Sequence, residues 1–177
     1  DKAVNKSTLQ QQMGLAVDAD IPLFGIVSRL NHQKGTDLLI QVAPQITKIP
    51  AQLVILGSDH AELEHQLTAL TQTYPHEIAV RIGFSEALSH LIEAGADCFL
   101  MPSRFEPCGL NQMYSQRYGT PPIVHATGGL LDTVVDCTPI TLANGSASGF
   151  VFYPMTAENL LNTIKRAATA YHHKKNW

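Results

Sequence analysis

The chain has 177 residues, of which 45% are hydrophobic and 15% charged, a composition typical of one globular domain or one half of a larger enzyme. Its formal net charge of −3 provides no global positive field, so we expect no nucleic-acid partner. Because no secretory signal is visible and no apolar run approaches the roughly 20 residues of a membrane-spanning helix, we expect a cytoplasmic protein with no membrane partner.

Short apolar strands alternate with amphipathic helices along the chain. In chain order, the pattern predicts strands over residues 21–30, 51–57, 78–84, 97–103 and 121–126, with a loop and short strand over 145–152. It predicts helices over residues 36–49, 61–74, 86–95, 110–118 and 156–177. Pro44 should bend the first of these helices or end it early, because proline lacks an N–H donor. Ser85 and Gly95 are expected to cap the helix between them.

Nearly continuous apolar strands alternating with helices predict a parallel sheet covered on both faces. We therefore expect an α/β fold, a doubly wound Rossmann-like sheet with helices on both faces. In such sheets ligands bind outside the carboxyl ends of the strands, so the residues that follow each strand are the candidates for a binding site.

The residues at these strand ends are cations, glycines and helix starts, which suit a diphosphate. Glycine lets backbone N–H groups approach phosphate, helix N-termini attract anions, and Arg and Lys bind phosphate oxygens. In chain order the strand-end residues are Arg29, Lys34, Gly35, Gly57, Ser58, Asp59, Gly83, Phe84, Ser103, Arg104, Glu106, Cys108, Gly109, Thr127, Gly128 and Gly129.

Each of these residues also has an ordinary structural interpretation. Arg29 and Lys34 fit solvated surface positions equally well, and Gly128 with Gly129 fits a simple turn. Cys108 suits packing better than nucleophilic catalysis, and Phe84 fits a core position. Their position together at the carboxyl ends of the strands favours a diphosphate-binding site.

Other site classes find little support in the sequence. The three cysteines, Cys98, Cys108 and Cys137, lack metal-ligand spacing, so we expect no metal. Neither GxGxxG nor GxxxxGK[ST] is present, which disfavours a dinucleotide cofactor and a P-loop, and no cofactor is expected. His90 and His125 fit a helix surface and a strand end.

Five segments in order, "VSRLNHQKGTDLL", "PSRFEPCGLNQ", "YGTPPIV", "TGGLLDTV" and "ASGFVF", resemble the C-terminal half of bacterial and plant-type glycogen (starch) synthases. The resemblance covers nearly the whole chain. It implies half of a GT-B fold in a retaining glycosyltransferase that moves glucose from ADP-glucose to the 4-hydroxyl at the non-reducing end of an α-1,4-glucan.

The resemblance also implies roles for single residues. Arg29 and Lys34 match the cationic pair that neutralises the donor diphosphate, and Glu106 matches the carboxylate beside the donor glucose. The remaining matches surround the other parts of the donor. Cys108 and Gly109 match positions beside the sugar, and the backbone amides of Gly109, Leu110 and Asn111 match those that hold the distal phosphate. Phe84 matches an aromatic ring against the nucleobase, and the glycine loops near the phosphates contain Gly57, Thr127, Gly128 and Gly129.

Some positions depart from the family pattern. Asn111 replaces the usual Thr, and His125 and Ala126 stand where basic residues are common. Arg104 has two open interpretations: a part in the site, or a structural ion pair with Glu106 or another carboxylate.

The resemblance implies that residues 1–177 form one nucleotide-sugar-binding domain, with a linker and first helix over residues 1–20, and that the N-terminal acceptor domain is absent. We then expect the chain alone not to elongate glucan, while the sequence leaves open whether it binds nucleotide by itself. Two alternatives stay open: a related transferase using UDP-glucose or another donor, and a non-catalytic nucleotide-binding module.

Overall fold

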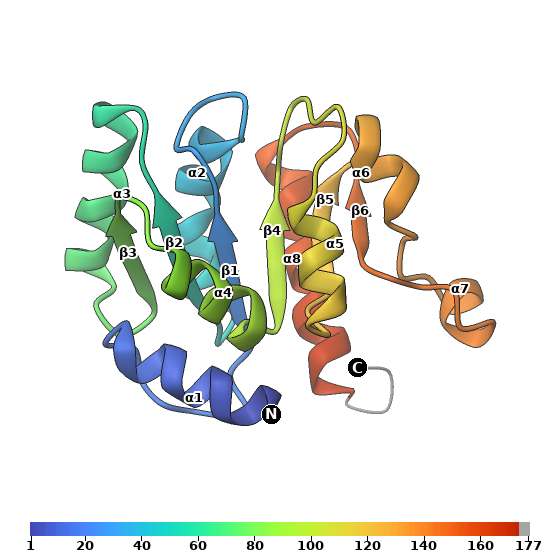
Figure 1. The fold of residues 1–177 in the computed structure, drawn as a ribbon, viewed down its shortest axis with the longest axis horizontal. Coiled ribbons are helices and arrows are strands. Elements are labelled where there is room, and N and C mark those ends of the chain that lie inside the picture. Colours follow the sequence, from blue (N-terminus) through green and yellow to red (C-terminus); the bar gives the residue numbers. More distant parts are fainter. Residues whose placement is uncertain (174–177) are drawn as a thin grey trace.

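The computed structural model describes residues 1–173 and shows a six-stranded parallel sheet with the strand order β3-β2-β1-β4-β5-β6 (Figure 1). The strands are β1 Leu23–Val27, β2 Gln52–Gly57, β3 Ile78–Ile82, β4 Cys98–Met101, β5 Pro122–His125 and β6 Phe150–Phe152. The chain builds the sheet outward from β1 to β3 and then returns to place β4 on the other side of β1. The order therefore reverses between β1 and β4, where a doubly wound sheet binds its ligand.

Helices cover both faces of this sheet, and the predicted doubly wound α/β fold is confirmed (Figure 1). Within the described residues the helices are α1 Lys2–Gln12, α2 Thr36–Ile46, α3 Ala61–Thr73, α4 Glu86–Gly95, α5 Asn111–Arg117, α6 Gly128–Thr133, α7 Pro139–Ala143 and α8 Ala157–His172. One core lies between the sheet and α2, α3 and α8, and a second lies between the sheet and α1, α4 and α6.

Strand β2 shows why both faces are covered. Its residues alternate between the two cores: Leu53 and Ile55 pack into one, and Val54 and Leu56 pack into the other. All four are buried, because successive side chains of a strand point to opposite faces and here both faces are apolar.

Two local predictions of helix boundaries have different outcomes. Ser85 caps α4 as predicted, since its side chain accepts a hydrogen bond from the Leu88 N–H at 3.3 Å. Gly95 is not a left-handed cap: it is the last residue of α4, and Ala96 continues in an extended conformation. Its small size serves packing instead, because a Cβ there would lie 2.7 Å from the carbonyl oxygen of Asn5 in α1.

The other helices differ from the prediction at their ends. Helix α2 contains Pro44 and ends at Ile46, three residues earlier than predicted. The short helix α7 was not predicted, although Thr138 and Thr141 form its capping box and Pro139 opens it. Helix α8 ends at His172, and residues 174–177 of the predicted final helix lie outside the described residues.

Candidate functional site

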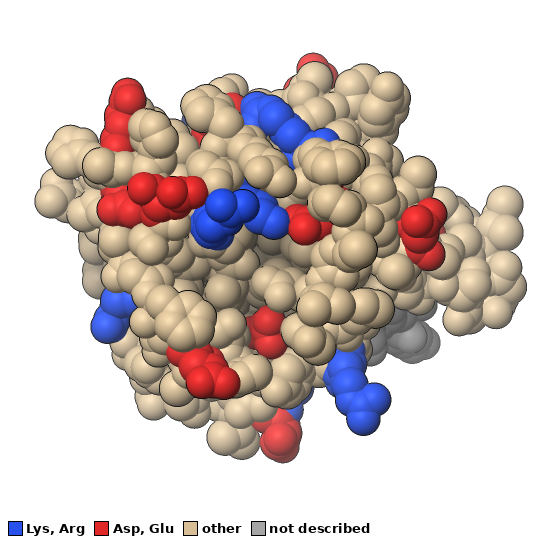
Figure 2. Space-filling view, turned by 45° about the horizontal axis from the view of Figure 1, so that its top comes forward, with Lys and Arg blue, Asp and Glu red and all other residues tan. Residues whose placement is uncertain are grey.

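Two loops meet where the strand order reverses, one over residues 28–35 after β1 and one over residues 102–110 after β4. They enclose a cavity of about 260 Å³. Its lining residues are Ile26, Val27, Ser28, Arg29, Lys34, Leu100, Met101, Pro102, Ser103, Glu106 and Asn111. Figure 2 turns this rim toward the viewer and shows side chains of both charges beside a hollow in the surface.

A glycine allows the two loops to approach each other this closely. Gly35 has a φ of 73°, a left-handed conformation that L side chains rarely adopt. A Cβ on Gly35 would lie 1.9 Å from the carbonyl oxygen of Pro102 in the other loop. The Arg104 N–H donates a hydrogen bond to the Gln33 carbonyl at 2.8 Å, so the loops are also joined backbone to backbone.

A half-buried ion pair lies inside the cavity. The Lys34 Nζ is 2.5 Å from Glu106 Oε2, and the two side chains are 20% and 14% exposed. The Ser103 hydroxyl donates to the same Glu106 oxygen at 3.2 Å. Arg29 lines the cavity and makes no ion pair with any residue of the described range 1–173. Two cations and one carboxylate leave an excess of positive charge, which suits an anion.

Arg104 takes the structural alternative considered above, and its partner is Asp37 in the first turn of α2. Both terminal nitrogens of the guanidinium donate to the Asp37 carboxylate at 2.7 Å. Burial alone would raise the pKa of Asp37, but the hydrogen bonds and charge of Arg104 outweigh it, and the pKa is lowered. Arg104 does not line the cavity.

The turn that enters α5 is held from within by Gln112. This buried side chain donates to the carbonyl oxygens of Cys108 and Gly109 at 3.1 and 3.2 Å. Gly109 has a φ of 64°, and Cys108 is exposed on the turn. Asn111 reaches the end of β1, where its amide nitrogen lies 3.4 Å from the Val27 carbonyl oxygen.

The glycine loop after β5 packs directly on the β4 loop. A Cβ on Gly128 would lie 2.2 Å from the Glu106 carbonyl oxygen, and one on Gly129 would lie 2.0 Å from the Cys108 carbonyl oxygen. The Gly129 N–H donates to the Glu106 carbonyl at 3.0 Å. These glycines, with Thr127 before them, therefore support the backbone of the loop that carries Glu106.

Four of the predicted site residues line the cavity: Arg29, Lys34, Glu106 and Asn111. The other eight lie outside its lining: Gly57, Phe84, Cys108, Gly109, Leu110, Thr127, Gly128 and Gly129. Phe84 follows β3, at the edge of the sheet, and is 86% exposed. Gly57 ends β2 and lies against the loop after β1, since a Cβ there would be 1.9 Å from the Ser28 carbonyl oxygen.

His125 was predicted only as a strand end, and the structure adds a contact with the site. It ends β5, is buried, and its Nδ1 lies 2.9 Å from the Ser103 carbonyl oxygen. A carbonyl can only accept, so Nδ1 carries the proton. The sequence predicts that His125 lies at the end of a strand, but which loop it contacts depends on the strand order.

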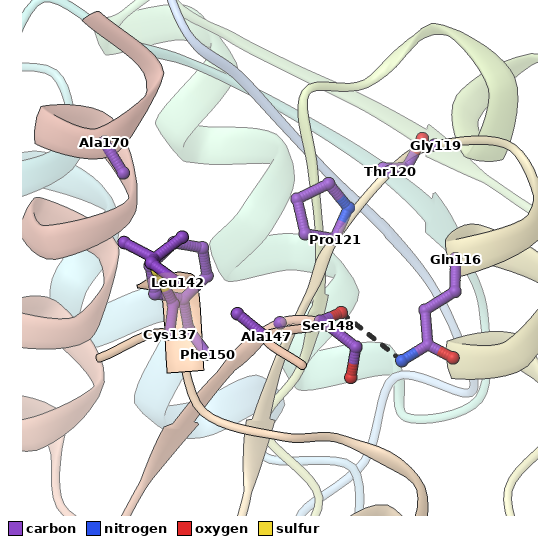
Figure 3. Close-up of a pocket in the computed structure, with 11 residues that line it drawn as sticks. Gln116, Gly119, Thr120, Pro121, Cys137, Leu142, Ala147, Ser148, Phe150 and Ala170 are labelled. Carbon is purple, nitrogen blue, oxygen red and sulfur yellow. Dashed lines mark hydrogen bonds between the residues drawn. The ribbon is translucent and has the colours of Figure 1, made fainter. Parts of the chain in front are cut away.

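A second cavity, of about 340 Å³, lies at the amino ends of β5 and β6 and is drawn in Figure 3. Its lining is apolar or uncharged, and Gln116 crosses its edge to donate to the Ser148 carbonyl at 3.3 Å. Because no charged side chain among residues 1–173 lines it, the described part of this cavity does not suit a diphosphate.

Within residues 1–173, no helix is long and apolar enough to span a membrane. The same residues contain no group of three His, Cys, Asp or Glu side chains arranged to hold a metal ion.

Comparison with known families agrees with this geometry. Residues 10–177 match the family model described as glycosyl transferases group 1. The chain belongs to the glycosyl transferase group 1 family. Its similarity to members of that family covers both loops of the cavity, and the family resemblance predicted from the sequence is confirmed.

Among group 1 glycosyl transferases, the chain is 67% identical over 176 residues to a glycogen synthase of Nitrosomonas eutropha and 63% identical to one of Nitrosospira multiformis. These matches cover 99% of the chain but only 35% and 36% of the relatives, so the chain spans about a third of their length.

The fold of the chain also matches a solved structure, the catalytic domain of starch synthase IV from Arabidopsis thaliana bound to ADP and acarbose. The TM-score is 0.90 at 34% identity, and the match covers 99% of this chain and 37% of that one.

Proposed function

We propose that the chain is the nucleotide-sugar-binding domain of a glycogen synthase, which transfers glucose from ADP-glucose to the non-reducing 4-hydroxyl of an α-1,4-glucan. The observation that carries this proposal is the cavity that joins Arg29, Lys34 and Glu106 where the strand order reverses. The similarity to glycogen synthases and to a starch synthase bound to ADP supports the choice of donor and product.

The donor diphosphate would occupy the cationic side of the cavity. Lys34 would give up its contact with Glu106, wholly or in part, and bind a phosphate oxygen instead. The exposed side chain of Arg29 would bind a second phosphate oxygen. The amides of Gly109, Leu110 and Asn111, at the turn into α5, would donate to the distal phosphate. Positive charge at this point stabilises the leaving nucleoside diphosphate, so the reaction needs no strong general acid.

The cavity favours retention without an enzyme nucleophile. Among the described residues, Glu106 is the only carboxylate in its lining, and it is already engaged by Lys34 and Ser103. The glycosidase scheme with two carboxylates therefore does not fit. In front-face attack the bond from glucose C1 to the phosphate oxygen breaks, a bond from C1 to the acceptor oxygen forms on the same face, and the acceptor proton passes to the leaving phosphate. Glu106 would orient the sugar hydroxyls or ease positive charge at C1, with Cys108 and Gly109 beside the sugar.

The nucleoside would extend from the cavity across the sheet toward Phe84. The ring of Phe84 is 86% exposed and free to stack on a flat base, and Gly57 lies between it and the cavity. Thr127, Gly128 and Gly129 would act on the phosphates mainly by supporting the β4 loop. The acceptor would be bound by a further domain, as the relatives' greater length suggests, so we expect the chain alone to bind ADP without extending glucan.

Titration calorimetry of this chain with ADP, UDP and inorganic phosphate tests the proposal. We expect ADP to bind more tightly than UDP or phosphate. The Lys34→Ala variant should bind ADP about 10- to 100-fold more weakly, because hydrogen bonds to charged groups are worth roughly 1.5–3 kcal/mol. Lys165→Ala, an exposed lysine of α8 away from the cavity, is the matched control and should bind like the wild type. Equal binding of ADP and UDP would favour a transferase with another donor, and no binding would contradict a donor site in this chain.

A further inference from the structure

The two loops that carry Lys34 and Glu106 are joined on the outer side of the cavity by Arg104. Its guanidinium donates to both oxygens of Asp37 at 2.7 Å and also to the His32 carbonyl. Its backbone N–H donates to the Gln33 carbonyl at 2.8 Å. One residue of the β4 loop thus contacts three positions in the opposite loop and helix start.

Asp37 is well placed to hold this contact. It lies in the first turn of α2, where the helix dipole favours a negative charge, and its side chain is only 18% exposed. Arg104 keeps its charge at any ordinary pH. A bidentate pair with an added carbonyl contact has a defined geometry, which a single lysine–carboxylate contact lacks.

The proposed reaction would weaken the contact between Lys34 and Glu106, which joins the two loops inside the cavity. The Lys34 ammonium group must redirect at least one of its N–H donors from Glu106 to the incoming phosphate. The Arg104–Asp37 pair is unaffected by this exchange, because neither residue lines the cavity. Arg104 is two positions from Glu106 and Asp37 is three from Lys34, so fixing this pair fixes the loop backbones beside both groups.

We propose that Arg104 and Asp37 are positioning residues, which hold the Lys34 and Glu106 loops at a fixed separation so that a diphosphate enters a preformed site. This inference rests on the proposed function. Without the pair, binding would also have to order both loops, and that cost would appear as weaker binding.

The test is titration of the chain with ADP for Arg104→Ala and Asp37→Asn. Each variant should bind roughly 3- to 30-fold more weakly than the wild type, and the double variant should be no worse than the weaker single one, because the two residues act as a unit. Guanidinium ion at millimolar concentration should restore binding to Arg104→Ala. Arg104→Lys should remain weak, because an ammonium cannot form the paired contact.

Arg166 provides a matched control at the far edge of the sheet. Its guanidinium also bridges an aspartate and a backbone carbonyl, those of Asp136 and Cys137, at 3.1 and 2.8 Å. Its side chain is 43% exposed, compared with 39% for Arg104. Arg166→Ala should bind ADP like the wild type, and guanidinium should leave its affinity unchanged.

The outcomes separate the two proposals. If the wild type binds ADP and Arg104→Ala binds equally well, the positioning role is wrong and the proposed function stands. If the wild type does not bind ADP, the proposed function is wrong, and the positioning role is wrong as well. If Arg104→Ala does not fold, Asp37→Asn decides by the same criterion, since asparagine keeps the shape of the side chain. Weaker binding of Arg104→Ala that guanidinium does not restore would show only a structural defect and would also overturn the positioning role.

Discussion

Under the proposed function, the chemistry of the site depends on one contact between single residues, that of Lys34 with Glu106. Each group neutralises the other in the ligand-free chain, and both side chains are largely shielded from water. An approaching phosphate therefore competes with the Glu106 carboxylate for the same ammonium group. The carboxylate should weaken nucleotide binding and yet serve the transfer step, so its removal should change the two properties in opposite directions.

Glu106→Gln tests this competition at the residue scale. The glutamine retains an acceptor for Ser103 but no longer neutralises Lys34, so the chain should bind ADP several-fold more tightly. Glucose transfer should fall by about 100-fold or more, as when a charge-stabilising group is removed from other active sites. Transfer is measured in a chimera in which this chain replaces the matching third of the Nitrosomonas eutropha relative. Normal turnover in the chimera would contradict a role for Glu106, and weaker ADP binding would contradict the competition.

Packing between elements shows where a sequence pattern is ambiguous. Gly95 ends α4 and was expected to serve as a cap, but its missing side chain lets α1 pack against α4. A glycine at a helix end suits either role, and only the position of α1 distinguishes them. The strands and long helices were predictable because their apolar periodicity is local, whereas the role of Gly95 depends on a contact with Asn5 across the fold.

Gly95→Ala distinguishes these roles at the element scale. Alanine normally favours a helix over glycine by about 1 kcal/mol, so a residue without packing constraints would gain stability. Here the new Cβ would lie 2.7 Å from the Asn5 carbonyl oxygen, and we expect a net loss of about 1–3 kcal/mol. Chemical denaturation measures it, with Thr68→Ala on the exposed face of α3 as the control, expected within about 0.5 kcal/mol of the wild type. Increased stability of Gly95→Ala would contradict the packing role.

For the whole molecule, topology explains how much of the candidate site was predictable. Parallel strands bring their carboxyl ends to one rim, so Arg29, Lys34 and Glu106 could be grouped without knowing the strand order. The partner of Arg104 could not be identified, because several carboxylates follow the strands and only the folded loops select Asp37. The contact of His125 with Ser103 depends likewise on β5 lying beside β4.

The end of the sheet opposite the site is held by a buried ion pair between Lys6 and Asp97. Lys6 lies in α1, and its ammonium group is 2.7 Å from Asp97 Oδ2 and 2.9 Å from the hydroxyl of Tyr171 in α8. Asp97 precedes β4 and also accepts a hydrogen bond from the Leu23 N–H at 2.8 Å. The first helix, the two central strands and the last helix therefore meet at one pair of charges. Figure 1 shows α1 below the sheet.

Lys6→Met tests this connection at the scale of the whole molecule. It leaves the Asp97 carboxylate buried without its cation, so the free energy of unfolding at pH 7 should fall by about 3–5 kcal/mol. Burial already raises the pKa of Asp97 despite the opposing charge of Lys6, and the variant should raise it further.

This raised pKa makes the effect of the substitution depend on pH. Between the ordinary pKa of an aspartate, near 4, and the raised pKa of the folded chain, the folded state binds more protons than the unfolded state, so the free energy of unfolding falls as the pH rises through this range. The deficit of Lys6→Met should therefore be smaller near pH 4 than at pH 7. A part that does not depend on pH remains, because Lys6 also donates to the Ala19 and Ile21 carbonyls. The double variant Lys6→Met with Asp97→Asn should recover part of the stability and lose this pH dependence, as measured by urea denaturation across the range. A deficit that is equal at both pH values would mean that lost packing, and not an unpaired charge, destabilises the variant.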